Sequence, residues 1–424
     1  MVGTPLRSPG VGIVAVTDPI GAATDEPPKH AADIFAKLES SRMEAYHLAS
    51  GLDVFPFYRE LDGEIGPSVH FGGRPMVMLG SNNYLGLTTD PRVRAAAIDA
   101  VERYGTGVTG SRLLNGTLPL HRELEEQLAG WVGAEAALVF TTGYTANLGL
   151  IAALAERPDA VFVDSAAHAS LVDGARLADG HLRAFRHNRP NSLRRGLRSW
   201  REQPDAGGVL VAVDGIYSME GDWAPLTDIA RLCRDYGARL LVDEAHALGV
   251  VGPHGAGTAA AVGVVPDLVM GTFSKSLASC GGFIAGSRAV IDFLKVHCRP
   301  LQFTASGVPA ALAAALASVR IAREEDWRRH AVAARAEQLR AGLAGLGYAV
   351  GADAHSAIVP VHVGDDWTAG HLWHALLDHG VYTNCAIAPA VPRAVLRTSV
   401  MATHSEADID RALHAFEVVR STSA

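Results

Sequence analysis

The chain has 424 residues, an apolar content of 48% and a formal net charge of −8, which leaves room for two or three domains with large cores and argues against nucleic acid as a partner. No run of 18 or more apolar residues predicts a membrane span. Four scattered cysteines, Cys233, Cys280, Cys298 and Cys385, have no paired spacing, which indicates reduced thiols in a cytoplasmic protein and excludes a disulfide framework or zinc site.

The N-terminal part is expected to contain a flexible leader followed by a helical arm. Residues 1–30 lack the basic start and long apolar stretch of a secretory signal. From residue 33 to about residue 59, apolar residues recur three and four apart, which predicts helix, and we assign residues 31–75 to the arm. PMVML (75–79) is a strand candidate that ends at the turn GSNNYLG.

Short apolar runs alternate with helical patterns through the middle of the chain. This alternation predicts an α/β fold with a mostly parallel seven-stranded sheet and helices on both faces, which we assign to a large domain over residues 76–308. The seven runs are AALVF (136–140), AVFVD (160–164), LRAFRH (182–187), GVLVAVD (208–214), ARLLVD (238–243), DLVMGT (267–272) and GFIAG (282–286).

The pattern changes after about residue 309, where we expect a smaller α+β domain over residues 309–424. An Ala- and Arg-rich region, 309–346, predicts long helix. Two strand candidates follow, SAIVPVHV (356–363) and AVLRTSV (394–400), and a final amphipathic helix is expected over about 405–420.

Polar residues follow most of the predicted strands of the large domain. Because ligands of open parallel sheets collect at the carboxyl ends of the strands, we expect these residues to converge on one edge. They are Thr141 to Tyr144, Asp164 and His168, Asp214 and Ser218, Asp243 and His246, and Thr272, Ser274 and Lys275.

Lys275, in GTFSKSLASCGG, is one of only four lysines in a chain rich in arginine. Arginine stays protonated and cannot form a Schiff base, whereas a lysine amine of lowered pKa can. A surface lysine is the ordinary alternative, and it is the interpretation we keep for Lys29, Lys37 and Lys295. The small neighbours of Lys275 and its place at a strand end favour an aldehyde cofactor, for which pyridoxal 5′-phosphate (PLP) is the usual choice.

PLP requires an acidic partner for its pyridine nitrogen and a cover for one face of its ring. Asp243 ends an apolar strand in LVDEAHALG and is the candidate acid, with a strand-end turn residue as the alternative. His168 could stack on the ring, although such a histidine is more often a core or turn residue. His246 and Ser218 could both reach the ring hydroxyl.

The phosphate of the cofactor requires hydrogen-bond donors. TTGYTANLGL (141–150) has the pattern of a strand-to-helix turn with Gly143 at its apex, and a helix N-terminus suits a phosphate. Thr272 and Ser274 can add hydroxyl donors. An ordinary capped turn is the alternative. The letters DEAH also occur in helicases, but the chain has no G-x-x-x-x-G-K-[ST] loop.

With these residues in place, the chain resembles the α-oxoamine synthases, which are fold-type I PLP enzymes. The resemblance spans roughly residues 33–420. It is carried by SNNYLGL (81–87), GTGVTGSRLLNGT (105–117), FTTGYTANLG (140–149), DSAAHASLVDGARL (164–177), VDGIYSMEGDWAPL (213–226), LVDEAHALGVVGPHGAG (241–257), GTFSKSLASCGGF (271–283), RPLQFTASGVPA (299–310) and LRTSVMATHS (396–405).

The resemblance implies a role for each matching residue. Lys275 would carry the cofactor and act as base, Asp243 would pair with the pyridine nitrogen, and His168 would stack on the ring. The remaining roles fall to residues that contact the ring hydroxyl (Ser218 and His246), hold the cofactor and its phosphate (Gly143, Tyr144, Thr272 and Ser274), reach the phosphate of the neighbouring subunit of a homodimer (Thr304), bind the amino-acid carboxylate (Arg397) and lie near the substrate (Asn82).

The resemblance also implies an activity, the PLP-dependent condensation of a small L-amino acid with an acyl thioester, usually with loss of carbon dioxide, to give an α-aminoketone. The acyl donor would be acyl-CoA or an acyl carrier protein. Residues 381–405 are similar to the serine palmitoyltransferase and autoinducer-synthase branches, but Ile387 stands where bacterial serine palmitoyltransferases have an extra arginine. Transamination on the same fold is one alternative, and a non-catalytic subunit, which would lack Lys275, is another.

Overall fold

The computed structural model describes residues 33–39, 41–351, 355–388 and 390–422, and these residues divide between Leu52 and Asp53 into two compact units. In the first unit, a 3-10 helix η1 (Ile34–Glu39) precedes α1 (Ser41–Ser50). The predicted leader lies outside the described residues. The helix expected to reach about Arg59 ends at Ser50 instead, because Gly51 follows it and Pro56 comes soon after.

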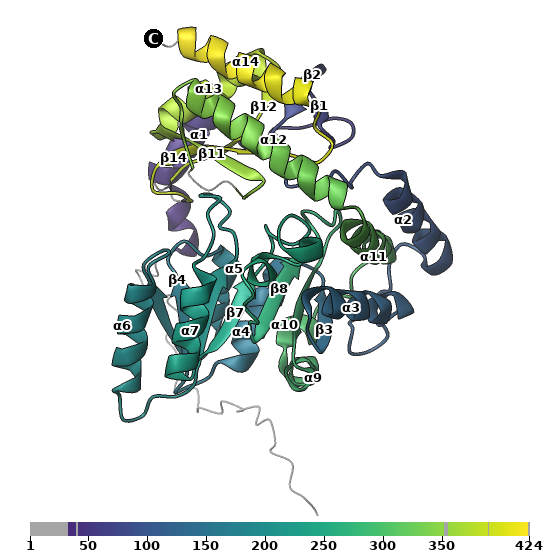
Figure 1. The fold of residues 1–424 in the computed structure, drawn as a ribbon, viewed down its shortest axis with the longest axis vertical. Helices are drawn as coiled ribbons and strands as arrows, with labels where there is room; N and C mark the ends of the chain where they lie inside the picture. Colours follow the sequence, from purple (N-terminus) through teal and green to yellow (C-terminus); the bar gives the residue numbers. More distant parts are fainter. Residues whose placement is uncertain (1–32, 40, 352–354, 389, 423–424) are drawn as a thin grey trace, which may run out of the picture. The chain divides into compact units, whose positions relative to one another are not determined.

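A seven-stranded sheet lies at the centre of the second unit, as the sequence predicted (Figure 1). The strand order is β3-β9-β8-β7-β6-β4-β5. Strands β4 to β8 pair in parallel, and β9 is antiparallel to both of its neighbours. The strands are β3 (Ala136–Phe140), β4 (Ala160–Asp164), β5 (His181–Phe185), β6 (Val209–Asp214), β7 (Arg239–Asp243), β8 (Leu268–Thr272) and β9 (Gly282–Gly286).

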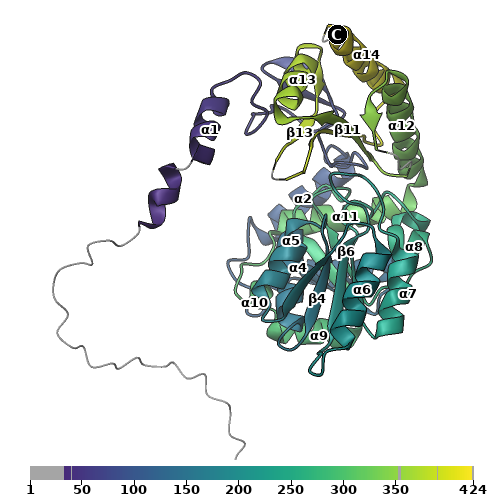
Figure 2. The same ribbon diagram turned by 90° about the vertical axis from the view of Figure 1, so that its left-hand side faces the viewer.

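Both faces of this sheet are covered by helices (Figure 2), which explains why its inner strands are almost entirely apolar. The edge strand β5 is partly exposed and carries His181 and Arg183. In β4, Val161 and Val163 pack into the core beneath one set of helices, and Phe162 packs into the core on the other face. The first set is α4 (Gly143–Leu154), α5 (Ala169–Leu177), α9 (Arg288–His297) and α10 (Arg299–Gln302), and the second face carries α6 (Pro190–Arg201) and α7 (Leu226–Tyr236).

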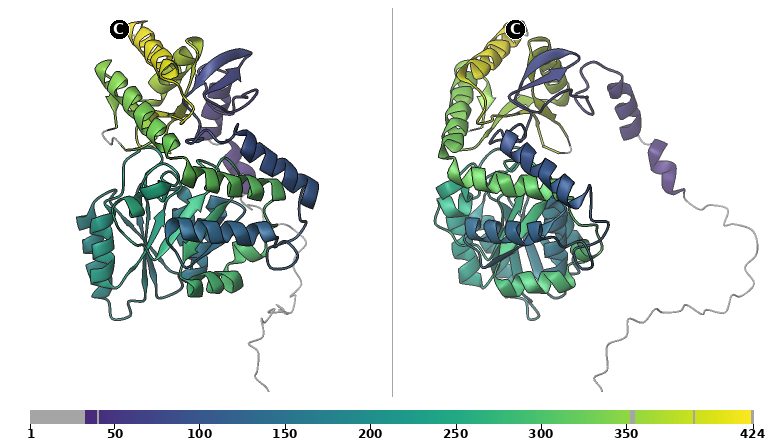
Figure 3. Two further views of the ribbon diagram at one scale, coloured as in Figure 1. Left: turned by 45° about the vertical axis from the view of Figure 1, so that its right-hand side comes forward. Right: turned by 90° about the vertical axis from the view of Figure 1, so that its right-hand side faces the viewer.

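Three further helices form a common core with the β3 side of the sheet (Figure 3). They are α2 (Pro91–Tyr104), α3 (Pro119–Val132) and α11 (Pro309–Glu324). Leu128 of α3 and Leu316 of α11 pack with Val139 and Phe283 in this core. The first helix of the predicted C-terminal domain therefore packs with the large sheet, and the predicted domain boundaries, at residue 309 and elsewhere, stay predictions.

The remaining elements share a separate core built around Trp373 and Phe416. One three-stranded sheet has the order β1-β2-β12, and one four-stranded antiparallel sheet has the order β10-β11-β14-β13. The strands are β1 (Ser68–Phe71), β2 (Arg74–Met78), β10 (Ala349–Val350), β11 (Ile358–Gly364), β12 (Val381–Tyr382), β13 (Asn384–Ala386) and β14 (Ala394–Ser399).

The helices of this part are α12 (Asp326–Gly345), α13 (Asp366–Asp378) and α14 (Glu406–Thr422). The helical region expected over 309–346 is two helices, α11 and α12, which are separated at Glu325. The short elements η2 (Pro253–Gly255) and α8 (Thr258–Ala261) complete the large sheet's surroundings. Among the described residues, no helix combines the length and apolarity needed to cross a bilayer.

Candidate active site

A cavity of about 260 Å³ lies at the carboxyl ends of the parallel strands, close to the lower end of the range of about 300–1,000 Å³ that is usual for small-molecule sites. The structure brings most of the residues predicted from the sequence to its wall. They are Gly143, Tyr144, His168, Ser218, Asp243, His246, Thr272, Ser274 and Lys275.

Lys275 lies in the loop that joins β8 to the antiparallel β9. This loop is closed at its base because the Phe273 amide and the Thr272 hydroxyl both donate to the Gly281 carbonyl, at 2.9 and 3.0 Å. Burial, with a smaller contribution from the charge of Arg397, lowers the pKa of Lys275 to about 8 against the opposing effect of Asp243. About a tenth of this amine is therefore neutral and nucleophilic at pH 7, and about half at pH 8.

Asp243 ends β7 as a buried carboxylate held on both oxygens. Its Oδ1 accepts from the Ala245 amide at 2.9 Å, and its Oδ2 accepts from Asn147 Nδ2 at 2.7 Å. Asn147, on α4, also donates to Ser170 Oγ at 2.9 Å. We did not single out Asn147 from the sequence. Its polar side chain next to the apolar residues of α4 nevertheless indicates a buried group that needs hydrogen-bond partners.

His168 stands at the wall of the cavity because it begins α5 at the edge of the sheet. Its amide donates to Asp214 Oδ2 at 3.0 Å, and its Nδ1 lies 2.7 Å from Ser170 Oγ. Burial lowers the pKa of His168 in spite of the nearby Asp243, so the imidazole is neutral near pH 7. The edge of the Tyr144 ring faces the His168 ring with 6.4 Å between centroids, and a neutral, flat ring can lie against an aromatic ligand.

The hydroxyl of Tyr84 connects three residues beside the cavity. Tyr84 is fully buried, and its hydroxyl donates to Asn82 Oδ1 at 3.0 Å and accepts from an Arg397 NH2 group at 3.1 Å. His246 Nδ1 lies 2.7 Å from the same oxygen. Neutral His246 must carry its proton on Nδ1 and donate it to the Tyr84 hydroxyl, because the single proton of that hydroxyl is already donated to Asn82. Burial lowers the pKa of His246 well below its usual value.

This network places Asn82 and Arg397 beside the cavity, behind the residues that form its wall. Arg397 Nε also donates to the Ser218 carbonyl at 2.5 Å. Thr304 instead lines a separate small pocket with Arg112 and His121, and its predicted role at a neighbouring subunit stays a prediction. Sequence reasoning missed Tyr84, although it lies within the quoted SNNYLGL segment.

Hydrogen-bond donors gather at the opposite end of the cavity, at the N-terminus of α4. Thr142 Oγ1 caps the helix by accepting from the Thr145 amide at 3.0 Å. A side chain at Gly143 would place its Cβ 2.7 Å from Met270 Cε and 3.0 Å from Thr272 Cβ, so a larger residue would have to displace the Met270 methyl group and press on Thr272. Thr272 and Ser274 hydroxyls lie 2.9 Å apart beside it. Helix N-termini of this kind bind phosphate.

The residues present therefore fit PLP. An anion-binding helix end lies at one side of the cavity, a buried carboxylate at another, and an amine of lowered pKa in its wall. Asp214 Oδ1, also in the wall, is buried and has no hydrogen-bond partner. Burial, followed by the charge of Asp243, raises the pKa of Asp214 well above its usual value.

His187, directly after β5, joins two loops that flank the cavity. Its Nδ1 lies 2.9 Å from Asp164 Oδ1 and its Nε2 lies 3.1 Å from Asp222 Oδ2. Asp164 precedes the His168 loop, and Asp222 closes the turn that carries Ser218, where the Tyr217 amide donates to the Asp222 carbonyl. Burial opposes protonation, but the two carboxylates prevail and raise the pKa of His187 to about 10.

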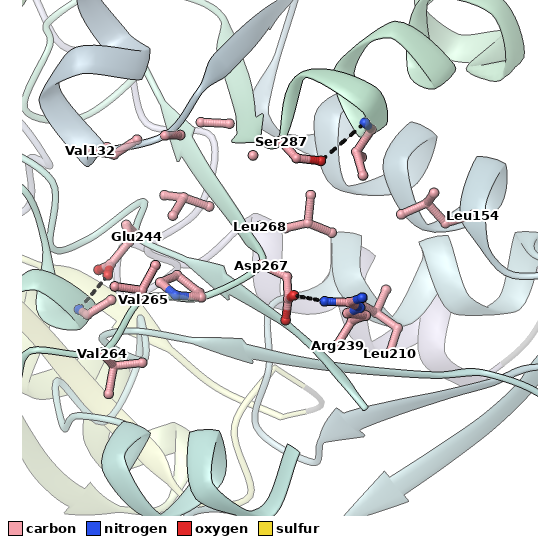
Figure 4. A pocket seen from close by; sticks show the side chains of 18 of the residues that line it. Val132, Leu154, Leu210, Arg239, Glu244, Val264, Val265, Asp267, Leu268 and Ser287 are labelled. Carbon is pink, nitrogen blue, oxygen red and sulfur yellow. Dashed lines mark hydrogen bonds and ion pairs between the residues drawn. The ribbon is translucent and has the colours of Figure 1, made fainter. Parts of the chain in front are cut away.

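A larger cavity of about 890 Å³ lies at the opposite, amino-terminal edge of the sheet (Figure 4). Its charged side chains are already paired within the protein, since Arg239 binds Asp267 at 2.6 Å and Glu244 accepts from the Thr258 hydroxyl at 2.8 Å. It therefore lacks the unpaired reactive groups of the smaller cavity. Among the described residues no cluster of three or more His, Cys, Asp or Glu side chains could hold a metal ion.

Comparisons with known proteins agree with this site. The aminotransferase class I and II family matches residues 74–416. A serine palmitoyltransferase of Caulobacter vibrioides is 43% identical over 378 residues, which are 88% of this chain and 93% of that protein. An 8-amino-7-oxononanoate synthase of Anaeromyxobacter sp. is 45% identical over 358 residues, which are 84% and 89% of the two chains. A solved serine palmitoyltransferase with a PLP internal aldimine is similar with a TM-score of 0.87 at 37% identity, over 92% of this chain and 99% of that one.

The chain therefore belongs to the aminotransferase class I and II family and, within it, to the α-oxoamine synthases. It is a PLP-dependent acyltransferase of the condensing kind. The fold class, family, cofactor and type of enzyme predicted from the sequence are confirmed.

Proposed function

We propose that this enzyme joins the α-carbon of a small L-amino acid to the acyl group of a thioester, releasing a thiol and carbon dioxide and giving an α-aminoketone. One observation supports this proposal above the others. Arg397 is buried, makes no ion pair within the described part of the chain, and lies beside the cavity that contains the amine of Lys275. A buried cation without a carboxylate partner favours an anionic ligand such as an amino acid.

Bound PLP supplies an aldehyde carbon for an amine to attack and a ring that accepts an electron pair from the substrate's α-carbon. Lys275 would hold the cofactor, and its amine, with a pKa of about 8, is suited to take the α-proton of the amino acid. Asp243 would keep the ring nitrogen protonated, and Asn147 fixes the orientation of that carboxylate. His168 would cover one face of the ring.

The remaining side chains hold the two ends of the cofactor and the substrate. His246, protonated on Nδ1, presents a bare Nε2 that can accept from the ring hydroxyl, and Ser218 shares this contact. Arg397 has five N–H donors, and two of them bind Tyr84 and Ser218, so others stay available for the carboxylate. Asn82 lies close to that group.

The phosphate is held at the N-terminus of α4 and by the β8–β9 loop. Gly143 and Tyr144 would offer backbone amides at the helix end, and Ser274 would offer its hydroxyl, whereas the hydroxyl proton of Thr272 is already donated to the Gly281 carbonyl. The Tyr144 hydroxyl also donates to Asp173 at 2.5 Å, which fixes the orientation of the Tyr144 ring beside His168.

We further propose that the enzyme is a homodimer in which Thr304 reaches the phosphate in the neighbouring subunit. Leu113, Leu114 and Phe303 are exposed, at 60%, 80% and 73%, and exposed apolar groups of this size favour a protein partner. The loops that carry them are tied together, because the Ser306 amide donates to the Gly110 carbonyl at 2.9 Å. A cytoplasmic location is proposed from the free cysteines.

A matrix of small amino acids against acyl-CoAs of increasing chain length tests the proposal and identifies the substrates, with thiol release and product mass as readouts. We expect thiol release in a stoichiometry of one per α-aminoketone. Ile387 packs against the core of the small sheets and brings no charge to the substrate side, so serine with palmitoyl-CoA need not be the best pair. Amino-group transfer to a keto acid without thiol release from any acyl-CoA would refute the condensing reaction.

A further inference from the structure

One strongly basic surface of the large sheet has no part in the site described above. Between residues 183 and 201 the chain has seven arginines and no acidic residue, whereas its overall formal charge is −8. All seven side chains are exposed. This arginine face comprises Arg183, Arg186, Arg189, Arg194, Arg195, Arg198 and Arg201.

The arginine face is built on a rigid support. Leu193, Leu197 and Trp200 of α6 are buried against the sheet, so Arg194, Arg195 and Arg198 lie on the outer side of this amphipathic helix. Arg201, also exposed, donates to the Gly207, Tyr236 and Gly237 carbonyls. Arg183, on the edge strand β5, lies over the Trp200 ring at 5.6 Å from its centroid. The support places the positive charges on one side of the molecule.

Most of these charges are not neutralised by the protein. Within the described residues, Arg183, Arg186, Arg189, Arg194 and Arg195 form no ion pair, although the chain contains 45 acidic residues. Arg198 lies only 3.9 Å from Glu202, an exposed pair, and such pairs contribute little. Unpaired positive charge on an acidic protein favours an acidic partner.

The arginine face begins at the edge of the sheet where the cavity lies. β5 runs parallel to β4, and the Ser165 amide, on the loop leading to His168, donates to the Phe185 carbonyl. Arg186 and Arg189 flank His187, which binds the turn that carries Ser218. From there α6 leads away from the cavity over 12 residues, a length of about 18 Å.

The extent of the face identifies the kind of partner. Two or three arginines would be enough to bind the phosphates in the nucleotide part of coenzyme A. Charges spread along a helix and a strand instead match the acidic surface of a small protein. A long polyanion or a lipid surface would also meet the remainder of the chain, which carries the negative charge. We propose, on the basis of the proposed function, that the arginine face docks a small acidic carrier protein that delivers the acyl thioester to the cavity.

The experiment uses the PLP-loaded, full-length enzyme with matched donors. The same acyl group is presented on a bacterial fatty-acid acyl carrier protein and on coenzyme A. In the variant Arg194→Glu/Arg195→Glu, we expect kcat/KM for the acyl carrier protein to fall by at least about tenfold, mainly through KM, and kcat/KM for acyl-CoA to change by less than about twofold. Binding of the unloaded carrier protein, measured by calorimetry at low and high salt, should weaken in parallel.

The control is Arg411→Glu/Arg420→Glu, which makes the same charge change at two exposed arginines of α14. It should behave as wild type with both donors, and thermal unfolding should confirm that both variants are folded. Equal losses in the two variants, or a wild-type enzyme that uses acyl-CoA but neither binds nor uses the carrier protein, would overturn the proposal.

An equal loss with acyl-CoA would assign the arginines to nucleotide phosphates instead and would also overturn it. Failure of the proposed function has a different signature. In that case the wild-type enzyme releases no thiol from either donor, while calorimetry still reports binding of the carrier protein at the arginine face.

Discussion

Tyr84 offers a sharp test of the site because its hydroxyl is shared by three side chains. In Tyr84→Phe, hydrogen bonds of 3.0 Å to Asn82, 2.7 Å to His246 and 3.1 Å to Arg397 disappear. A neutral hydrogen bond contributes about 1 kcal/mol net and one to a charged group about 1.5–3 kcal/mol. We therefore expect the variant to lose about 3–5 kcal/mol of unfolding free energy as apoenzyme.

Tyr348→Phe is the matched control, because that hydroxyl makes a single bond of 2.9 Å to the Phe416 carbonyl and its loss should cost about 1 kcal/mol. Equilibrium urea unfolding of both variants gives the comparison. The affinity of the Tyr84 variant for the amino acid should also fall, by about tenfold for each 1.4 kcal/mol of lost positioning of Arg397. A Tyr84→Phe loss no larger than that of Tyr348→Phe would refute the shared-hydroxyl arrangement.

Three other predictions concern charge. The rate at which the apoenzyme captures PLP, followed by visible absorbance, should rise with pH and level off above about 8, since Lys275 must be neutral. A midpoint near the ordinary lysine pKa of about 10.4 would contradict this. In Lys275→Ala, borohydride should fix no cofactor to the protein. Asp243→Asn keeps the size of the side chain that Asn147 holds but removes its charge, so PLP affinity and turnover should each fall at least about tenfold, and wild-type turnover would count against the role in ring protonation. In His187→Gln, the free energy of unfolding should fall short of the wild-type value by the largest amount below about pH 6.5. This difference should shrink as the pH rises towards the folded pKa of about 10. A difference that stays constant across that pH range would show that the charge of His187 is not what stabilises the Asp164 contact.

The large sheet could be predicted from the sequence because most of its strands are buried on both faces and are therefore apolar throughout. β4 and β6 show this most clearly, since every residue in each is buried. Helix α13 was not predicted, because glycine, threonine and two histidines interrupt its apolar pattern. The predicted helix that continues to Arg59 was too long, because the helical spacing of apolar residues persists beyond Gly51, which follows the end of α1.

The predicted residues that the structure brings to the cavity are those whose position near the end of a strand is visible in the sequence. Lys275, Asp243 and His168 follow strands directly, and parallel strands bring their ends together. Asn147 and Tyr84 act through partners 96 and 162 positions away, Asp243 and His246. No local pattern encodes such pairs, because they are set by the packing of separate segments.

Because the loop between β8 and β9 is closed, the conformational entropy of the Lys275 backbone is lost during folding and not during cofactor binding. The bonds from Phe273 and Thr272 to the Gly281 carbonyl are made within the polypeptide, so the lysine backbone is fixed when the sheet forms. Gly281 has a φ of 140° and a Cβ there would lie 2.4 Å from the Phe273 ring, so this closure of the loop requires glycine at that position. An incoming cofactor therefore meets a preorganised nucleophile, and little of its binding free energy is spent on ordering the chain.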